Sequence, residues 1–368
     1  MGAPDLRIGT SGWNYPTGRG TWNGVFYPPS RGRAKGFDEL SFYAEHFNTV
    51  EVNSTFYGQP RAEVTRGWAA RTPKDFEFSI KLYQKFTHPN MFKETFTKGV
   101  SPSGDMGRPG GLEKAGRPEN PRSLQNKDAL LDALARPNQA DLDEFRRGIE
   151  PLASAGKLGA LLAQFPPSFK DGPASRDYLL WLLQAFADYR VAVELRHGSW
   201  SDATGDTLSL LSPFGSAWVQ IDEPKFRFSI KQNFLPNVQG VYYMRLHGRN
   251  AKQWWHHEKA EDRYNYLYTA PELSEFVETL DAARQIVGKA YLYTNNHFSA
   301  KSVANAAMIK KQLGEPLEGE YSEAFLTKYP ELAGFAKPPA RKGDGNPFYP
   351  PGFTAREPPL DRGRRKNR

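Results

Sequence analysis

The chain has 368 residues, 39% of them hydrophobic, and no cysteine, which excludes disulfide bonds, thiolate chemistry and cysteine-based zinc sites. No apolar run reaches the ~20 residues of a membrane span, and no signal-peptide core precedes the first apolar run, so we expect a cytoplasmic protein with no membrane partner. The net charge is +8, but the nine basic and three acidic residues after position 336 supply +6 of it.

Eight short apolar runs follow one another along the chain, and each ends in polar residues. Side chains alternate between the two faces of a strand, so residues two apart share a face. Each run would therefore present one apolar face and one face that becomes polar toward the C-terminal end. The predicted strands cover residues 6–13, 49–57, 76–82, 161–165, 191–197, 217–222, 241–248 and 290–297.

Segments with helical character separate most of these strands. They cover residues 37–46, 61–70, 140–154, 175–188, 204–211, 271–287 and 302–313, whereas the link 223–240 has no clear helix. Alternation of eight strands with helices predicts an α/β fold, a single (β/α)8 TIM-type barrel with a parallel sheet inside and helices outside.

Two segments do not fit the barrel core. Residues 98–126, after the third strand, are rich in Gly, Pro and charge, and we expect an insertion over the C-terminal face, either a lid or disordered. We place the barrel domain at residues 1–315 and a disordered, Pro/Gly-rich basic tail at 316–368. Such a tail keeps a protein soluble or contacts nucleic acid.

Barrel enzymes carry their active sites at the C-terminal ends of the strands. Three acidic and three basic side chains fall on the polar strand faces there, together with a histidine, and an unpaired buried charge is costly, so we expect a paired network. This network is either structural or part of a site. The candidate catalytic residues are Glu51, Glu194 and His247. The candidate substrate-binding residues are Trp13, Asn53, Lys81, Gln164, Arg196, Trp200, Asp222, Arg245 and Asn295.

These residue types suggest particular chemistry. Arg196, Arg245 and Lys81 suit a phosphate or carboxylate. Glu51 and Glu194 could act as general acid and base, since crowding of two acids raises one pKa. His247 could carry protons or serve as a hydrogen-bonding partner.

Metal and nucleotide cofactors have little support in the sequence. The acidic residues and His247 could hold Mg²⁺, Mn²⁺ or Zn²⁺, but basic residues on the same strands compete for them and no HxH or HExxH spacing occurs. No Walker A or GxGxxG motif is present. We therefore predict no metal site and no cofactor, with a divalent metal as the alternative.

Seven motifs occur in one order along roughly residues 6–315: GTSGWNY, FNTVEVNSTFY, FEFSIKL, LLAQFPPSF, VAVELRHGSW, YMRLHG and YTNNH. Together they resemble the YecE-like family, domain of unknown function 72. The resemblance implies a TIM-type barrel and implies no known reaction. The chain departs from the usual pattern in the 98–126 insertion and the basic tail.

Three functions are compatible with these features. The first is an acid–base enzyme that acts on a polar small molecule, preferably an anionic one, such as a carbohydrate or phosphorylated metabolite. The second is a nucleic-acid-binding or endonuclease-like barrel, favoured by the tail and disfavoured by the nearly neutral barrel. The third is a non-catalytic ligand-binding or scaffold protein.

Overall fold

The computed structural model describes residues 5–97, 131–232, 240–254 and 258–339. The predicted insertion at 98–126 lies outside the described residues, as does the part of the predicted tail from residue 340 onward.

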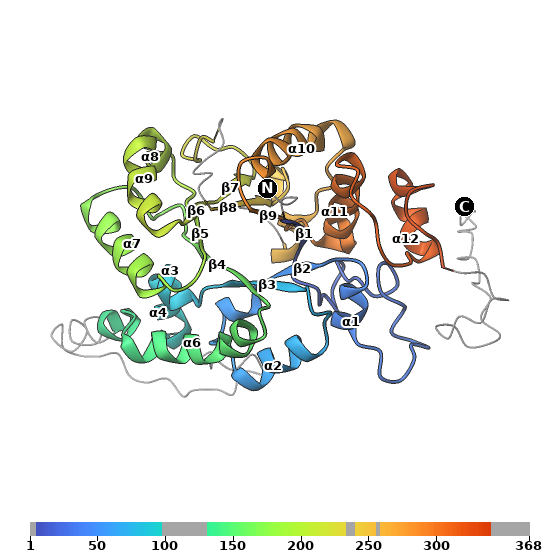
Figure 1. Cartoon of the computed structure of the whole chain (residues 1–368), viewed down its shortest axis with the longest axis horizontal. Helices are drawn as coiled ribbons and strands as arrows, with labels where there is room; N and C mark the ends of the chain where they lie inside the picture. The colour runs from blue at the N-terminus through green and yellow to red at the C-terminus, as the bar shows by residue number, and fades with distance from the viewer. Residues whose placement is uncertain (1–4, 98–130, 233–239, 255–257, 340–368) are drawn as a thin grey trace, which may run out of the picture.

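Nine parallel strands form one sheet in the order β6-β5-β4-β3-β2-β1-β9-β8-β7. β1 pairs with β2 on one side and with the last strand, β9, on the other. The sheet therefore curls into a ring with the helices outside it (Figure 1). The strands are β1 (Asp5–Ser11), β2 (Thr49–Val52), β3 (Glu77–Lys81), β4 (Leu158–Gln164), β5 (Val191–Glu194), β6 (Ala217–Trp218), β7 (Gln220–Asp222), β8 (Val241–Leu246) and β9 (Lys289–Thr294).

The sixth predicted strand is broken in two at Val219. Its first half, β6, pairs with β5, and its second half, β7, pairs with β8. The Gln232 side chain bridges the break, since its Oε1 accepts from Ile221 N at 2.9 Å and its Nε2 donates to Val219 O at 2.7 Å. The eight predicted strands and the TIM-type barrel are thus confirmed, with this one interruption.

The seven predicted helical segments are all helices, with ends shifted by a few residues. They are α1 (Glu39–Ala44), α2 (Ala62–Ala70), α6 (Gln139–Ser154), α7 (Pro173–Ala185), α9 (Thr204–Leu211), α10 (Ala270–Arg284) and α11 (Lys301–Gln312). Among the helices whose bounds lie within the described residues, four short ones were not predicted: α3 (Gln84–Thr87), α4 (Pro89–Thr97), α8 (Gly198–Asp202) and α12 (Glu323–Lys328). The described part of the link after β7, residues 223–232, contains no helix, in agreement with the sequence.

Two helices of the outer layer approach each other closely at a glycine. Thr65 of α2 donates through Oγ1 to the carbonyl of Gly148 of α6 at 2.7 Å. A Cβ atom at Gly148 would lie 2.0 Å from the carbonyl oxygen of Pro60. No side chain fits at this position without a shift of the backbone.

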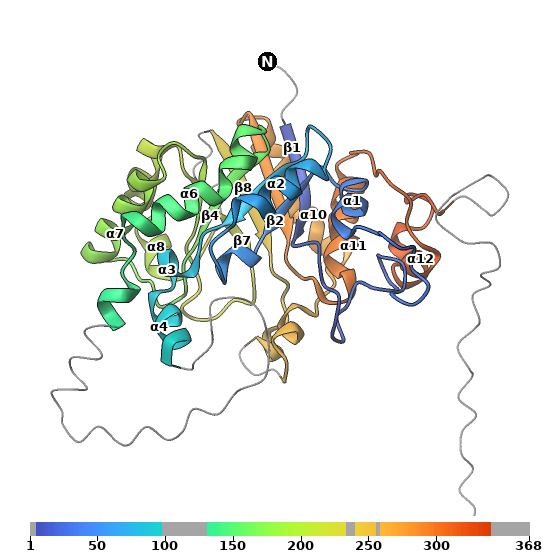
Figure 2. The same cartoon turned by 90° about the horizontal axis from the view of Figure 1, so that it is seen from below.

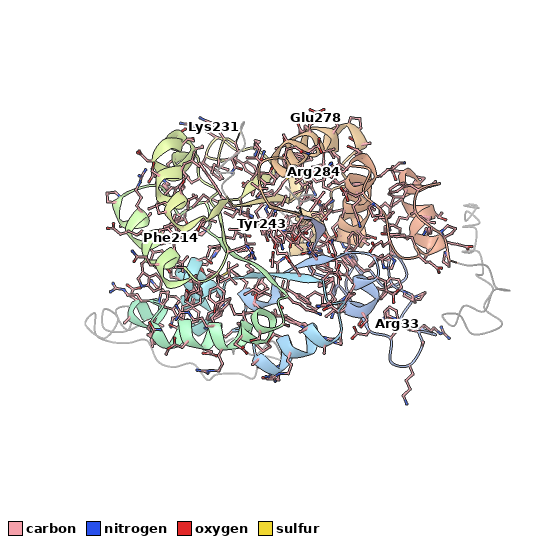
Figure 3. The ribbon with its side chains drawn as sticks, in the orientation of Figure 1. Arg33, Phe214, Lys231, Tyr243, Glu278 and Arg284 are labelled. Carbon is pink, nitrogen blue, oxygen red and sulfur yellow. The ribbon has the colours of Figure 1, made fainter. Side chains whose placement is uncertain are left out.

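Hydrogen-bonded tyrosines fill the middle of the barrel. Tyr243 lies at the centre of the ring of strands (Figure 3), and it is fully buried, as are Tyr291 and Tyr293. The Tyr291 hydroxyl donates to Glu77 Oε2 at 2.6 Å, and the Tyr293 hydroxyl lies 2.7 Å from Thr49 Oγ1 and 2.9 Å from Ser79 Oγ. Because each of these tyrosine hydroxyls has a partner, the middle of the barrel is a packed core.

The folded structure continues beyond the predicted boundary at residue 315. Phe325 of α12 is fully buried, Ser322 Oγ donates to Val25 O at 2.8 Å, and Tyr321 N donates to Lys337 O at 2.8 Å. α12 lies on the outside of the ring beyond α1 and α11 (Figure 1). Residues 316–339 therefore pack on the barrel, unlike the disordered tail expected from position 316.

No helix among the described residues is long and apolar enough to cross a membrane.

Candidate functional site

Most of the predicted polar residues meet at the C-terminal ends of the strands. The register pairs Ser11 with Glu51, and Gln164 with Glu194, and paired residues of parallel strands share a face. This end lies opposite the end at which β1 begins, and the short helices α3 and α4 lie beside it (Figure 2). We refer to it as the mouth of the barrel.

Arg245 is the central side chain of the mouth. Its Nε and Nη2 donate to the two oxygens of Glu51 at 2.9 and 2.7 Å, a two-pronged ion pair. Its Nη1 donates to Gln164 Oε1 at 2.8 Å and also to Glu194. Arg245 is only 1% exposed, so these bonds are formed out of contact with water.

Each oxygen of the Glu51 carboxylate also accepts a second hydrogen bond. Ser11 Oγ donates to Glu51 Oε1 at 2.7 Å, and the Tyr243 hydroxyl donates to Oε2 at 2.8 Å. With Arg245, four donors surround this fully buried carboxylate. It is held in one position by strands β1 and β8.

A second ion-pair group connects Glu194, Arg196 and Glu223. Arg196 Nε donates to Glu194 Oε1 at 2.7 Å. On its other side, Arg196 Nη1 lies 3.2 Å from Glu223 Oε2, within ion-pair distance, yet that oxygen has no partner in hydrogen-bonding geometry. Arg196 Nη2 also lies 3.3 Å from His247 Nε2, so this guanidinium is shared among Glu194, Glu223 and His247.

Burial and neighbouring charges shift the pKa values of these acids in opposite directions. Burial alone would raise the pKa of Glu194, but Arg245 and Arg196 hold it well below the usual value. Burial raises the pKa of Glu223, with a further contribution from Glu194, and Arg196 only partly offsets this. The acid with a raised pKa is thus Glu223, which the sequence interpretation did not include.

His247 is a neutral hydrogen-bonding partner. Its Nδ1 lies 2.9 Å from Asn295 Nδ2, and its Nε2 lies 3.3 Å from Arg196 Nη2 and 3.5 Å from both Arg245 Nη1 and Glu194 Oε1. Burial, with a contribution from the positive charge of Arg245, lowers the pKa of His247 to about 3. The edge of Trp254 covers the ring, with 6.4 Å between ring centroids.

Lys81 lies at the mouth end of β3 and differs from the other charged residues there. Its Nζ lies 4.1 Å from the centroid of the Phe56 ring, and in the described ranges no carboxylate pairs with it and no hydrogen bond is formed. Burial lowers the pKa of Lys81 to about 7, and the positive charge of Arg245 adds to this effect. A substantial fraction of this amine is neutral at neutral pH.

Asn53 also has a polar atom without a hydrogen-bond partner among the described residues. It lies one residue beyond the last registered pair of β2 and β3, Val52 with Ile80, which places it level with Lys81. Its Oδ1 is buried and has no hydrogen-bond donor among the described residues.

Three predicted residues do not join this group. The sequence predicts Asp222 on the inner face of the barrel. Ile221 is the residue that pairs with Arg245 and shares its inner face, so the predicted orientation of Asp222 is wrong. Asp222 instead accepts from Arg249 at 2.9 and 3.0 Å and from the Tyr268 hydroxyl at 2.7 Å, on the helix side of the sheet.

The two tryptophans pack against protein. Trp200 is fully buried, and it stacks on Phe169 with 5.5 Å between ring centroids while its Nε1 donates to Phe169 O at 2.9 Å. Trp13 is partly buried and meets Trp68 of α2 edge to face at 5.5 Å. In this structure both are parts of the aromatic core around the strand ends.

The part of the chain that the structure describes contains no group of three or more His, Asp or Glu side chains arranged to hold a metal ion. The acids of the mouth are separated from one another by the guanidinium groups of Arg196 and Arg245.

Solved structures with the same fold come from two bacteria. A crystal structure of a DUF72 family protein from Thermotoga maritima is 28% identical, covers 84% of this chain and all of its own, and has a TM-score of 0.62. A DUF72 family protein from Enterococcus faecalis is 21% identical, covers 85% of this chain and 97% of its own, and also has a TM-score of 0.62. The second likeness shows the fold alone.

Among curated proteins, the UPF0759 protein YunF of Bacillus subtilis is 26% identical over 328 residues, which are 86% of this chain and 96% of YunF. The UPF0759 protein YecE of Escherichia coli is 42% identical over 53 residues, 14% of this chain and 20% of YecE. The family model described as "Protein of unknown function DUF72" matches residues 7–327. The chain therefore belongs to the DUF72 family.

Proposed function

We propose that the chain is an enzyme that acts on a polar small molecule at the mouth of the barrel, with the amine of Lys81 as its reactive base. The observation that carries the proposal is the missing counter-charge of Lys81. Within the described residues no carboxylate forms an ion pair with Lys81: Glu51 and Glu194, whose charges act on its amine, are paired with Arg245 and Arg196, whereas Lys81 faces an aromatic ring.

The partners of Glu51 and Glu194 favour a role other than the general acid and base expected from the sequence. Glu51 accepts from Ser11, Tyr243 and Arg245, and Glu194 is held below its usual pKa by two arginines. A carboxylate stabilised in its charged form is a poor proton acceptor at neutral pH. Both glutamates are better suited to hold the arginines in place than to transfer protons.

A lysine beside other cations is suited to chemistry at neutral pH. Loss of hydration and nearby positive charge both favour the neutral amine, and a neutral amine can take up a proton or attack carbon. With a pKa of about 7, Lys81 can do either under physiological conditions. This match between pKa and working pH is what general base catalysis requires.

The surroundings of Lys81 favour a polar and partly anionic substrate. The Asn53 carboxamide oxygen has no donor among the described residues, and the Arg196 side chain is 14% exposed beside its ion pair with Glu223. An amide and a guanidinium together suit hydroxyl and carboxylate or phosphate groups. A carbohydrate or a phosphorylated metabolite fits this description.

The test is the reactivity of Lys81 toward a trace of acetic anhydride across pH 5–11, read peptide by peptide by mass spectrometry. We expect acetylation of Lys81 to rise with a midpoint near pH 7, while Lys231, whose side chain is 71% exposed, serves as the reference amine. If Lys81 becomes reactive only at alkaline pH, alongside the exposed lysines, the proposal is wrong.

A ligand screen separates an enzyme from a binding protein. The melting temperature is measured with sugar phosphates, nucleotides, short oligonucleotides and divalent metals, for the wild type and for Lys81→Met and Lys231→Met. A ligand whose stabilising effect is reduced by Lys81→Met alone lies at the mouth. Turnover of that ligand should be lost in Lys81→Met, whereas a non-catalytic binder has no turnover to lose.

The nucleic-acid alternative depends on the basic residues after position 336. If it is correct, ending the chain after residue 336 should weaken oligonucleotide binding and flatten its salt dependence. Lys81→Met should then have no effect on that binding.

A further inference from the structure

Besides Glu223 Oε2, two polar groups of the mouth have no hydrogen-bond partner among the described residues, and they lie at the ends of the adjacent strands β2 and β3. One is the amine of Lys81 and the other is the amide oxygen of Asn53, level with it on the adjacent strand. Buried polar groups in folded proteins are nearly always hydrogen-bonded, so groups left open mark the place of a ligand or water. The surrounding residues Glu51, Glu194, Gln164, Arg245 and His247 all have their partners within the protein.

We propose that Lys81 forms an imine with the carbonyl carbon of a small polar aldehyde or ketone. The proposal rests on the function proposed above, because both require a free amine, and it adds the substrate class and the bond that forms. Imine formation needs an amine that is neutral, accessible from the mouth and not held by a carboxylate, since an ion pair would keep it protonated. Lys81 is partly exposed and meets all three conditions.

The aromatic ring at Lys81 is consistent with this chemistry. Phe56 belongs to the short helix η1 (Ser54–Phe56) that follows β2, and its ring lies 4.1 Å from Nζ. An apolar surface beside an amine excludes water without offering a counter-ion, and desolvation favours the neutral form. The main chain of Lys81 is fixed as well, since Thr55 Oγ1 donates to its carbonyl at 2.7 Å.

The reaction balances without any redox partner. The Lys81 nitrogen attacks the carbonyl carbon, the C=O π electrons move to oxygen, and the proton released by nitrogen is transferred to that oxygen to give a carbinolamine. Protonation of the hydroxyl by solvent lets it leave as water while the nitrogen lone pair forms the C=N bond of an iminium ion. The iminium then draws electrons from the adjacent carbon, which makes a neighbouring C–H or C–C bond easier to break.

Asn53 is placed to assist the first of these steps. Its free Oδ1 can accept a hydrogen bond from the carbinolamine hydroxyl, whose carbon is attached to the nitrogen of the neighbouring Lys81. Asn53 is therefore a positioning residue for the adduct and does not set the reactivity of the amine. The two roles can be separated by experiment.

The experiment traps the adduct by reduction. The full chain is incubated at pH 7 with glycolaldehyde, dihydroxyacetone or pyruvate, briefly reduced with borohydride, digested and analysed by mass spectrometry. We expect a secondary amine on Lys81 with at least one probe, at roughly ten times or more the level on Lys231, because an ordinary lysine amine is less than about 0.1% neutral at this pH. Lys81→Arg should remove this label, and Lys231→Arg should not.

The outcomes distinguish the two proposals. If acetic anhydride modifies Lys81 with a midpoint near pH 7 but no probe gives an adduct, the imine is wrong and the reactive amine stands. If Lys81 is acetylated only at alkaline pH, both proposals are wrong. Asn53→Ala should lower the carbonyl adduct several-fold and leave acetylation unchanged; equal adduct in this variant would exclude the role of Asn53.

Discussion

At the level of single residues, Arg245 is the side chain that connects the polar groups of the mouth. It forms four hydrogen bonds to Glu51, Gln164 and Glu194 while almost completely buried. Removing one partner of a buried ion pair leaves an uncompensated charge, which costs far more than the net stabilisation from the pair. Arg245 is thus a structural requirement for the site and is not available to anchor a substrate.

Arg245→Ala should lower the free energy of unfolding by about 3–5 kcal/mol, because two glutamates lose their main counter-charge. Arg245→Lys keeps the charge but loses the two-pronged geometry, so we expect an intermediate loss. Urea unfolding followed by circular dichroism measures both. The control is Lys231→Ala on the periphery of the molecule (Figure 3), where an exposed pair with Asp202 stabilises by at most about 1 kcal/mol. A loss for Arg245→Ala no larger than that of the control would contradict this interpretation.

The buried histidines predict a dependence of stability on pH. The pKa of His247 is about 3 in the folded chain and about 6.5 in the unfolded chain, so between these values the unfolded state binds more protons. Stability therefore falls as the pH drops below 6.5, by up to ~1.4 kcal/mol per pH unit for this one ring. His88 and His297, whose pKa values burial lowers to about 3, act in the same direction.

His247→Asn should make this dependence shallower by about 1.4 kcal/mol per pH unit between pH 6.5 and 4.5. The measurement is the free energy of unfolding in urea at several pH values in this window. Glu223, whose pKa is raised, contributes in the opposite direction, but it is present in both proteins and cancels in the comparison. Identical slopes for the variant and the wild type would mean that His247 is protonated in the folded state.

At the level of secondary-structure elements, the contact between α2 and α6 makes glycine more favourable than alanine at one helical position, the reverse of the usual preference. Alanine normally stabilises a helix relative to glycine by about 1 kcal/mol. Gly148 of α6 and Gly67 of α2 both lie within helices, but a Cβ at Gly148 would overlap the Pro60 carbonyl, whereas a Cβ at Gly67 meets nothing within 4 Å. The two glycines form a matched pair.

We expect Gly148→Ala to destabilise the protein by roughly 1–3 kcal/mol through overpacking and Gly67→Ala to stabilise it by about 0.5–1 kcal/mol. Thermal unfolding of the two variants beside the wild type measures both effects. Opposite signs are the expected result. If both substitutions stabilise, α6 can move away from residue 60 at little cost.

The strands also show how far the sequence predicts the site. Alternation alone places Glu51, Gln164, Glu194, Arg245 and His247 at the mouth, because the inner face of each unbroken strand follows a period of two. It fails for Asp222, since the sixth strand is interrupted at Val219 and the inner face passes to Ile221. For the same reason Glu223, one residue later, was overlooked.

Pairing within the mouth could not be predicted from the pattern. The pattern predicts three acids and three bases on inner faces, but it does not predict that both arginines pair with glutamates while the Lys81 amine, in the described part of the chain, faces the Phe56 ring. These contacts depend on which strands lie across the barrel from each other and on side-chain length. Likewise, Trp200 lies in the short helix α8 after β5, and its indole turns toward Phe169 and into the core.

At the level of the whole molecule, residues 316–339 are part of the fold. Four large apolar side chains in this stretch are almost fully buried: Tyr321, Phe325, Tyr329 and Leu332. Burial of such a side chain contributes about 1.5–3 kcal/mol. Together they amount to a large part of the stability of a typical domain.

Ending the chain after residue 315 should therefore abolish cooperative unfolding, while ending it after residue 339 removes none of the described contacts and should leave the melting temperature unchanged. Differential scanning calorimetry of the two shortened chains tests this. A sharp transition near the wild-type temperature for the shorter chain would show that the segment is dispensable.

The closure of the ring also bears on how the protein is made. β1 acquires its second neighbour only when β9 has been synthesised. Likewise, Val25 and His46 can form their hydrogen bonds with Ser322 and Glu320 only after those residues have been synthesised. At the usual rate of translation this interval lasts tens of seconds. During that time the nascent chain carries an unpaired strand edge, which favours aggregation. We therefore expect the newly made protein to depend on chaperones until its last residues leave the ribosome.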